Sequence, residues 1–130
     1  MHVEFHYTVS STKSFDQALK DLEANLAEAK FGVLWALDVP AKLKEKGVDF
    51  NQPYRILEVC NPVKAKQALE TDPMVGYFLP CKLTVFIKDG KTQMGMVRPT
   101  MVMDMVGNAG LKEFAAEVDE ALKDVLDKSR

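Results

Sequence analysis

The chain has 130 residues, of which 47% are hydrophobic and 28% are charged. This length and apolar content suit one domain spanning residues 1–130, with enough residues to bury a single core and too few for two. Its 17 basic and 19 acidic side chains give a formal net charge of −2, so no broad basic face is available and nucleic acid is not an expected partner.

The start of the chain, residues 1–5, has neither the basic residues nor the long apolar stretch of a secretory signal. No run elsewhere approaches the roughly 18 apolar residues of a membrane span. We therefore expect a cytoplasmic protein with no membrane partner. In such a reducing compartment, two cysteines are more often free thiols, ligands or redox partners than a permanent disulfide.

Hydrophobic and polar side chains alternate over residues 2–9, the period-two pattern of a strand with one buried face. The apolar side of this predicted strand consists of Val3, Phe5, Tyr7 and Val9. Ser14 and Gln17 then form a capping box, in which the serine hydroxyl accepts the Gln17 backbone N–H and the glutamine side chain reaches back. Apolar residues at three- and four-residue spacing continue to Ala29, which predicts a first amphipathic helix.

Residues 31–37 form an uninterrupted apolar run that is too short for a helix of its own. Such a run is typical of a strand covered on both faces, so we expect it to lie centrally in the sheet. Asp38 and Pro40 then provide a cap and a proline near the first turn, and Gly47 is a natural terminator. These residues predict a short helix over residues 40–46.

Residues 54–60 are predicted to form the third strand, and Asn61 followed by Pro62 predicts a helix of about nine residues with its own cap and first-turn proline. Residues 74–80 then form a loop with an unusual apolar content, and such a loop must pack against something.

Residues 81–87 and 92–97 are predicted to be the fourth and fifth strands. Asp89 and Gly90 lie between them, at the centre of a two-residue hairpin turn in which both residues need positive φ. A short irregular or helical segment follows over residues 101–106. A closing helix then carries an apolar stripe, from Leu111 to Val125.

Strands placed between two long helices favour an α+β fold, with a mainly antiparallel sheet of about five strands and the long helices packed on one face. A parallel βαβ arrangement around the helix that follows Pro62 is the alternative. The choice decides whether the two cysteines meet. Antiparallel neighbours bring Cys60 and Cys81 to one edge of the sheet, whereas parallel neighbours send them to opposite ends.

Cys60 and Cys81 are the only cysteines, and each lies at the end of an apolar run. Cys60 directly precedes the helix cap at Asn61, where unpaired N–H groups and the helix dipole favour a thiolate, so we expect a lowered thiol pKa. Glu58 lies on the same strand face as Cys60 and is the acid nearest to it in sequence. Three interpretations stay open: small buried hydrophobic residues, redox thiols, or ligands of a metal or small molecule.

A second candidate site, a pocket or an interface, is apolar and rich in methionine. It comprises Met74, Tyr77, Phe78, Met101 and Met103. Methionine side chains fill irregular gaps or line adaptable binding surfaces. No cofactor or metal is predicted, because zinc usually takes four ligands and no Cys-x-x-Cys pair is present. The chain also lacks a dinucleotide motif, a phosphate loop and a nucleophile elbow, which removes the main support for nucleotide-binding and hydrolase functions.

Four segments of the sequence can be matched to a known family. They are residues 30–34, 43–47, 54–62 and 76–82, and they include Cys60-Asn61-Pro62 and Leu79-Pro80-Cys81. These segments resemble the small bacterial and archaeal family catalogued as domain of unknown function 302, over nearly the whole chain. The resemblance implies a β-α-β-β-β-β-α fold with a curved antiparallel sheet, and it assigns no activity, since a fold does not fix a function.

The predicted function is that of a small-molecule or protein binding module. An enzymatic function is less favoured and would need an acid or base near the thiols, for which Glu58 is the nearest residue in sequence. We expect the protein to act as a homodimer and to take a small apolar ligand, because exposed apolar segments of this kind commonly form interfaces. The alternative is a thiol-based redox or metal-responsive protein that uses Cys60 and Cys81.

Overall fold

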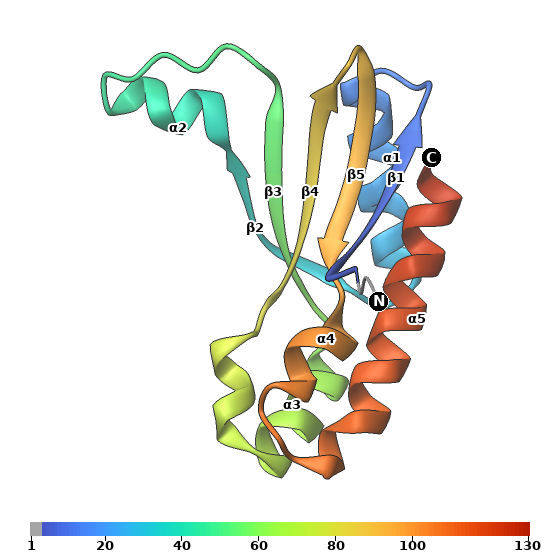
Figure 1. Cartoon of the computed structure of the whole chain (residues 1–130). Coiled ribbons are helices and arrows are strands. Elements are labelled where there is room, and N and C mark those ends of the chain that lie inside the picture. The colour runs from blue at the N-terminus through green and yellow to red at the C-terminus, as the bar shows by residue number, and fades with distance from the viewer. Residues whose placement is uncertain (1–3) are drawn as a thin grey trace.

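The computed structural model describes residues 4–130 as a five-stranded sheet with helices on one face and at one end (Figure 1). The predicted strand position Val3 lies outside the described residues. In chain order the elements are β1 (His6–Ser11), α1 (Phe15–Glu28), β2 (Gly32–Asp38), α2 (Val39–Glu45), β3 (Tyr54–Cys60), α3 (Pro62–Thr71), the 3₁₀ helix η1 (Pro73–Tyr77), β4 (Cys81–Lys88), β5 (Lys91–Val97), α4 (Pro99–Asp104), the 3₁₀ helix η2 (Ala109–Leu111) and α5 (Lys112–Ser129).

The strand order is β1-β5-β4-β3-β2, and every neighbouring pair is antiparallel. The predicted α+β fold class is therefore confirmed. The parallel alternative is excluded, because β3 and β4 on either side of α3 run in opposite directions. The two long helices, α1 and α5, pack together on one face of the sheet (Figure 1).

The main core lies between that face and the two helices. Leu57, Leu83 and Met94 from the three central strands are fully buried, and they meet Leu22 of α1 and Leu122 of α5 in one cluster. The period-two pattern of the strands and the helical spacing of α1 and α5 thus point their apolar sides toward each other.

Local signals in the sequence set most element boundaries. The Ser14 hydroxyl accepts the Gln17 backbone N–H at 3.2 Å, although the Gln17 side chain donates to Asp21 rather than back to the cap. The Asp38 carboxylate caps α2 by accepting a backbone N–H of its first turn, and the Asn61 side-chain carbonyl caps α3 in the same way. Asp89 and Gly90 have φ values of 54° and 76°, as the predicted hairpin turn requires.

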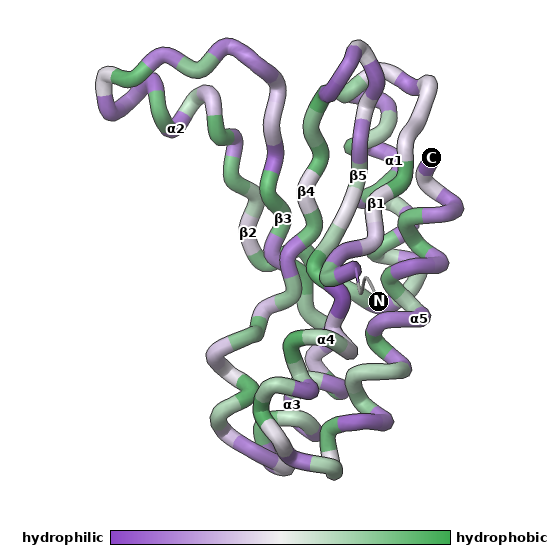
Figure 2. Tube along the Cα trace, viewed as in Figure 1, coloured by the Kyte–Doolittle hydropathy of each residue, from purple (hydrophilic) through white to green (hydrophobic). Residues whose placement is uncertain are grey.

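Two predictions of burial are wrong. Residues 31–37 were expected to lie at the centre of the sheet, but β2 is an edge strand whose Leu34 and Trp35 side chains are 61% and 51% exposed. An apolar run shows that a segment is hydrophobic without showing what covers it, and Figure 2 shows hydrophobic residues along β2 as well as along the central strands. Phe5, expected on the buried side of the first strand, precedes β1 and is 60% exposed.

A second, smaller hydrophobic cluster lies beyond the end of the sheet, where α3 and α4 gather around the start of α5 (Figure 1). The apolar segment predicted to be a loop contains η1, and Val75 of η1 is fully buried in this cluster. Met103 of α4 joins it, whereas Met94 and Met96 belong to the main core. Methionine packing therefore accounts for these three side chains.

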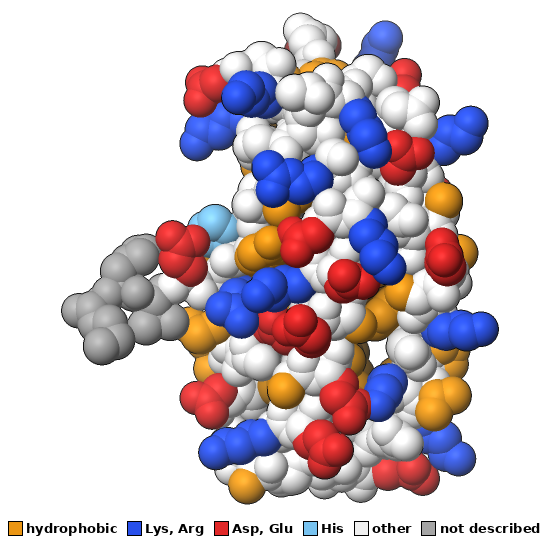
Figure 3. All heavy atoms as spheres, turned by 90° about the vertical axis from the view of Figure 1, so that its right-hand side faces the viewer, with side chains coloured by type: hydrophobic (Ala, Val, Ile, Leu, Met, Phe, Trp, Pro, Cys, Tyr) orange, Lys and Arg blue, Asp and Glu red, His pale blue; other side chains and the backbone are white. Residues whose placement is uncertain are grey.

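Acidic and basic side chains are interspersed over the side of the molecule that Figure 3 shows. Neither sign of charge forms a continuous patch there. Within residues 4–130, none of the helices combines the length and the apolar character that a membrane span requires.

Candidate functional site

The two cysteines lie at the same end of the sheet, as the antiparallel arrangement requires. Cys81 is paired across the β3–β4 ladder with Val59, so Cys60 lies one position beyond that pair. Both thiols are free and partly buried. They line a narrow hollow of about 10 Å³ beside Phe31 and Phe114, which leaves no room for a bound molecule.

The lowered pKa expected for Cys60 is wrong. Burial raises the pKa of the Cys60 thiol, and burial together with the neighbouring Cys60 raises the pKa of Cys81 to about 11. The first turn of α3 is capped by the Asn61 side chain, which accepts the Lys64 backbone N–H at 3.2 Å, so the thiol is not the group that satisfies this helix end. Both cysteines are therefore neutral thiols at pH 7.

A larger cavity, of about 350 Å³, opens next to Cys81. It lies where the ends of β3, β4 and β5 meet η1 and α4. Its lining consists of Glu58, Tyr77, Phe78, Leu79, Pro80, Cys81, Lys82, Val97, Pro99, Val102 and Met103. The cavity therefore combines parts of the two predicted sites, the thiol site and the apolar site.

Five of the nine predicted site residues line this cavity, and they are Glu58, Tyr77, Phe78, Cys81 and Met103. Cys60 and Asn61 lie beside it in the narrow hollow. Met74 is 54% exposed and Met101 is partly buried, and neither lines the cavity or the hollow.

The lining has an apolar interior and a charged side. Glu58 and Lys82 are direct partners across the β3–β4 ladder, and both line the cavity. Lys82 is exposed and Glu58 is partly buried. The other strand and helix residues of the lining, such as Val97 and Val102, offer hydrocarbon surface.

One wall of the cavity is held in place by a buried carboxylate that sequence reasoning missed. Asp119 of α5 is 3% exposed, and it accepts hydrogen bonds from the Arg98 guanidinium at 3.3 and 3.4 Å and from the Thr100 hydroxyl at 2.8 Å and backbone N–H at 3.3 Å. Burial by itself raises the pKa of Asp119, but the hydrogen bonds from Thr100 and Arg98 outweigh it and lower the pKa. The bonds tie the start of α4, and with it Pro99, to α5.

The sequence did carry a signal for Asp119. This residue lies four positions after Ala115 and three before Leu122, both of which are buried, so helical spacing places it on the apolar stripe. A charged residue on such a stripe needs a partner. The partner, Arg98, lies between β5 and α4 and is not identifiable from helical spacing alone.

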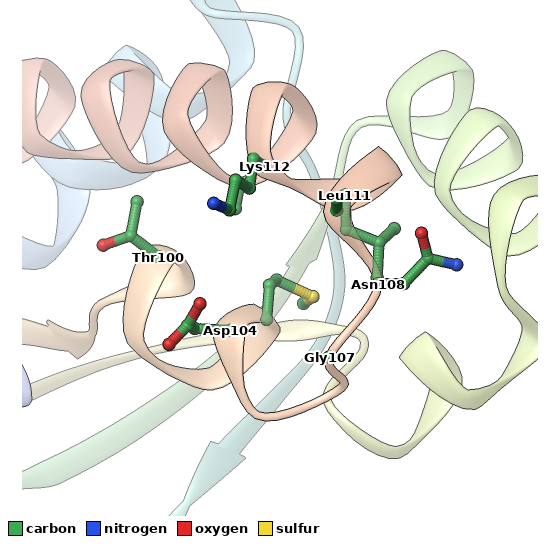
Figure 4. Close-up of a pocket in the computed structure, with 9 residues that line it drawn as sticks. Thr100, Asp104, Gly107, Asn108, Leu111 and Lys112 are labelled. Atoms are coloured by element: carbon green, nitrogen blue, oxygen red, sulfur yellow. The ribbon is translucent and has the colours of Figure 1, made fainter.

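Sequence reasoning also missed a second hollow, of about 290 Å³, between α4 and the start of α5 (Figure 4). Thr100, Asp104 and Lys112 border it, and both charged side chains are exposed. The Asn108 side chain is turned away and donates to Asp72 at 3.2 Å (Figure 4). This hollow is more polar and lacks the apolar interior of the cavity at Cys81.

The described part of the chain contains no cluster of side chains arranged as a metal-binding site. Across residues 4–130, no group of three or more histidine, cysteine, aspartate or glutamate side chains is placed to hold a metal ion. The ring of His6 instead contacts Glu4 and Thr8.

Comparisons with known proteins show extensive similarity to an uncharacterised group. The family model described as "Domain of unknown function DUF302" matches residues 7–129. The crystal structure of the uncharacterized conserved protein DUF302 from Bacillus stearothermophilus is 45% identical in sequence, with a TM-score of 0.93, and the alignment covers 98% of this chain and 100% of that one. No curated protein matches the sequence.

Proposed function

We propose that this chain, which belongs to the DUF302 family, is a binding module. It takes a small apolar ligand in the cavity beside Cys81 and acts as a homodimer. The observation that carries this proposal is the cavity itself. Its volume of about 350 Å³ falls within the range of small-molecule sites, and its lining has the usual composition of apolar walls with a few polar groups.

The lining supports one class of ligand over others. Leu79, Val97 and Val102 offer hydrocarbon contact, and the thiol of Cys81 is neutral, so the interior suits an apolar or aromatic body. Lys82 and Glu58 lie at the more exposed side, where they suit a polar end group that stays close to water. The proposed ligand is therefore a small amphipathic molecule whose anionic or polar end reaches Lys82.

The test uses anilinonaphthalene sulfonate, a fluorescent dye with an aromatic body and an anionic end. We expect it to bind and brighten in the native protein, and we expect Val102→Trp, which fills the cavity, to abolish most of that signal. Val63→Trp is the matched control, because Val63 on α3 is 68% exposed and lies outside the cavity. Lys82→Ala, at an exposed position, should weaken dye binding through loss of the sulfonate contact without affecting folding.

Dye can also bind apolar side chains exposed elsewhere, so the decisive quantity is the difference between the two tryptophan variants. Equal dye binding by Val102→Trp and Val63→Trp, with circular dichroism showing both to be folded, would rule out this cavity as the ligand site.

The alternative function, a redox or metal-responsive protein that uses Cys60 and Cys81, has less support. Burial raises the pKa of both thiols, which disfavours an attacking thiolate at neutral pH. The offset register also leaves Cys81 opposite Val59 rather than Cys60.

A further inference from the structure

The cavity beside Cys81 carries two charges of opposite sign. Of the described residues that line it, only Glu58 and Lys82 are charged. They lie directly opposite each other in the β3–β4 ladder. Residues paired in this way share one face of a sheet, and their Cβ atoms lie about 4.5–5.5 Å apart. The acidic and the basic residue are therefore anchored next to each other at one end of the sheet.

Both residues lie on the face of the sheet that α1 and α5 leave uncovered. Leu57 and Leu83, their neighbours in sequence, are fully buried in the core beneath those two helices. Because successive side chains of a strand point to opposite faces, Glu58 and Lys82 project from the other side. Figure 1 shows α1 and α5 together on one face of the sheet. A ligand can therefore reach both residues without displacing a helix.

Neither charge is taken up by another charge in the described part of the chain. Within residues 4–130, the ion pairs join other residues, and Glu58 and Lys82 do not pair even with each other. By contrast, Arg98 and Asp119, which hold the α4 wall of the cavity, already bind each other. Glu58 and Lys82 are thus the charged groups at this cavity whose hydrogen-bonding capacity is left for water or a ligand.

The rest of the lining suits a hydrocarbon group of modest size. Leu79, Val102 and Met103 offer apolar contact. The volume of about 350 Å³ is near the lower end of the range for small-molecule sites, about 300–1,000 Å³. The cavity therefore fits a compact molecule better than a long acyl chain or a dinucleotide.

We propose that the ligand of this cavity is an apolar α-amino acid, whose ammonium group binds Glu58, whose carboxylate binds Lys82 and whose side chain enters the apolar interior. In such a molecule a single carbon atom separates the two charges, which matches two neighbouring residues of one ladder. A peptide holds its terminal charges farther apart. The inference rests on the proposed function for the cavity itself and names the class of ligand that the cavity takes.

The paired charges also select against related molecules. The formal charges of Glu58 and Lys82 cancel, so a ligand with both charges meets two attractive contacts. A ligand with only one charge meets one attractive and one repulsive contact, and it leaves the other protein group without a partner. Selectivity for the zwitterion is therefore the property that identifies this site.

The test compares L-phenylalanine with two probes that have the same ring and lack one charge each. Phenylpropionate lacks the ammonium group, and phenethylammonium lacks the carboxylate. We expect the native protein to bind phenylalanine at least about tenfold more tightly than either probe, as measured by isothermal titration calorimetry. Trp35, the single tryptophan, pairs with Glu58 across the β2–β3 ladder, so its emission gives a second readout of binding.

Glu58→Gln removes the proposed contact with the ammonium group. Phenylalanine and phenylpropionate should then bind within about threefold of each other. The same variant should bind anilinonaphthalene sulfonate more tightly than the native protein does, because the repulsion of the sulfonate is gone. A variant that was merely destabilised would lose affinity for every probe, so the opposite signs separate recognition from damage.

Lys82→Met removes the proposed contact with the carboxylate and should bring phenylalanine and phenethylammonium within about threefold of each other. Lys88→Met is the matched control. Lys88 is exposed on the same strand and the same face as Lys82, and it lies outside the cavity. Its substitution should change neither ratio by more than about twofold.

The outcomes separate this inference from the proposed function. Equal affinity of the native protein for the three probes would overturn the inference and leave the cavity proposal standing. Dye binding without measurable binding of phenylalanine would do the same. Equal dye binding by folded Val102→Trp and Val63→Trp would instead remove the cavity as the ligand site, and the inference with it.

Discussion

Cys81 shows how one buried side chain can act on stability rather than on chemistry. Its thiol lies between the narrow hollow and the larger cavity, and burial is the main cause of a pKa of about 11. A thiol with this pKa is a poor nucleophile at pH 7. The residue is better suited to forming part of an apolar wall.

The raised pKa predicts a pH dependence of unfolding. Because the folded state holds the Cys81 proton more tightly than the unfolded state does, the stability from this group is complete below the ordinary thiol value of 9.0 and is lost as pH rises through about 11. Over that window the native protein should lose up to about 3 kcal/mol more unfolding free energy than Cys81→Ala loses, as two pKa units imply.

Urea unfolding at a series of pH values measures this difference. Cys60→Ala is the control and should keep most of the loss of unfolding free energy with rising pH. Burial contributes more to the raised pKa of Cys81 than the neighbouring Cys60 does. Parallel pH profiles for the native protein and Cys81→Ala would show that the thiol ionises as freely in the folded state as in the unfolded one.

At the scale of elements, Asp119 joins three parts of the chain. Its carboxylate on α5 accepts hydrogen bonds from the Arg98 guanidinium, which follows β5, and from the Thr100 hydroxyl on α4. The wall of the cavity that α4 contributes therefore depends on a single buried acceptor.

Asp119→Asn keeps the shape of the side chain and removes its charge. We expect a loss of about 2 kcal/mol of unfolding free energy at neutral pH, because hydrogen bonds to a buried charged group are stronger than neutral ones. Since the folded-state pKa is lowered, the advantage of the native residue is present above the ordinary aspartate value of 3.8 and disappears as pH falls through the folded pKa.

Chemical denaturation at neutral and acidic pH tests this expectation against Asp124→Asn. Asp124 lies on the same helix and pairs with Lys128 at the surface, so its substitution should change stability by less than about 0.5 kcal/mol. A constant difference between native protein and Asp119→Asn from pH 7 to pH 3 would contradict a role for the charge.

Local elements were the most predictable part of this fold. Capping by Ser14 and Asn61 and the turn at Asp89 and Gly90 depend on contacts within a few residues, which the sequence contains directly. The place of β2 in the sheet depends instead on which strands pair, and hydrophobicity alone is equally compatible with a central strand and an apolar edge.

The candidate site was predictable only in part, for the same reason. Alternation and antiparallel pairing bring Glu58 and Cys81 to one end of the sheet, as the sequence suggested. The cavity, however, forms only because η1 and α4, far apart in sequence, approach the same strand ends. The partnership of Asp119 with Arg98 depends on that approach as well.

At the scale of the whole molecule, the proposed dimer makes stability depend on concentration. A dimer that dissociates on unfolding is stabilised by mass action, so its Tm should rise with protein concentration. Differential scanning calorimetry at several concentrations measures this rise in Tm. A native Tm that stays constant would mean that folding and association are not linked.

The division of the apolar interior has a consequence for local unfolding. Helix α5 contributes Val118, Leu122, Val125 and Leu126 to the main core and Ala115 to the smaller cluster beside the cavity. Phe114 packs against both clusters and so connects them. Because regions with separate packing can open separately, we expect the smaller cluster to behave as its own cooperative unit. Opening of the smaller cluster alone would admit a ligand to the cavity while the sheet and the main core stay folded.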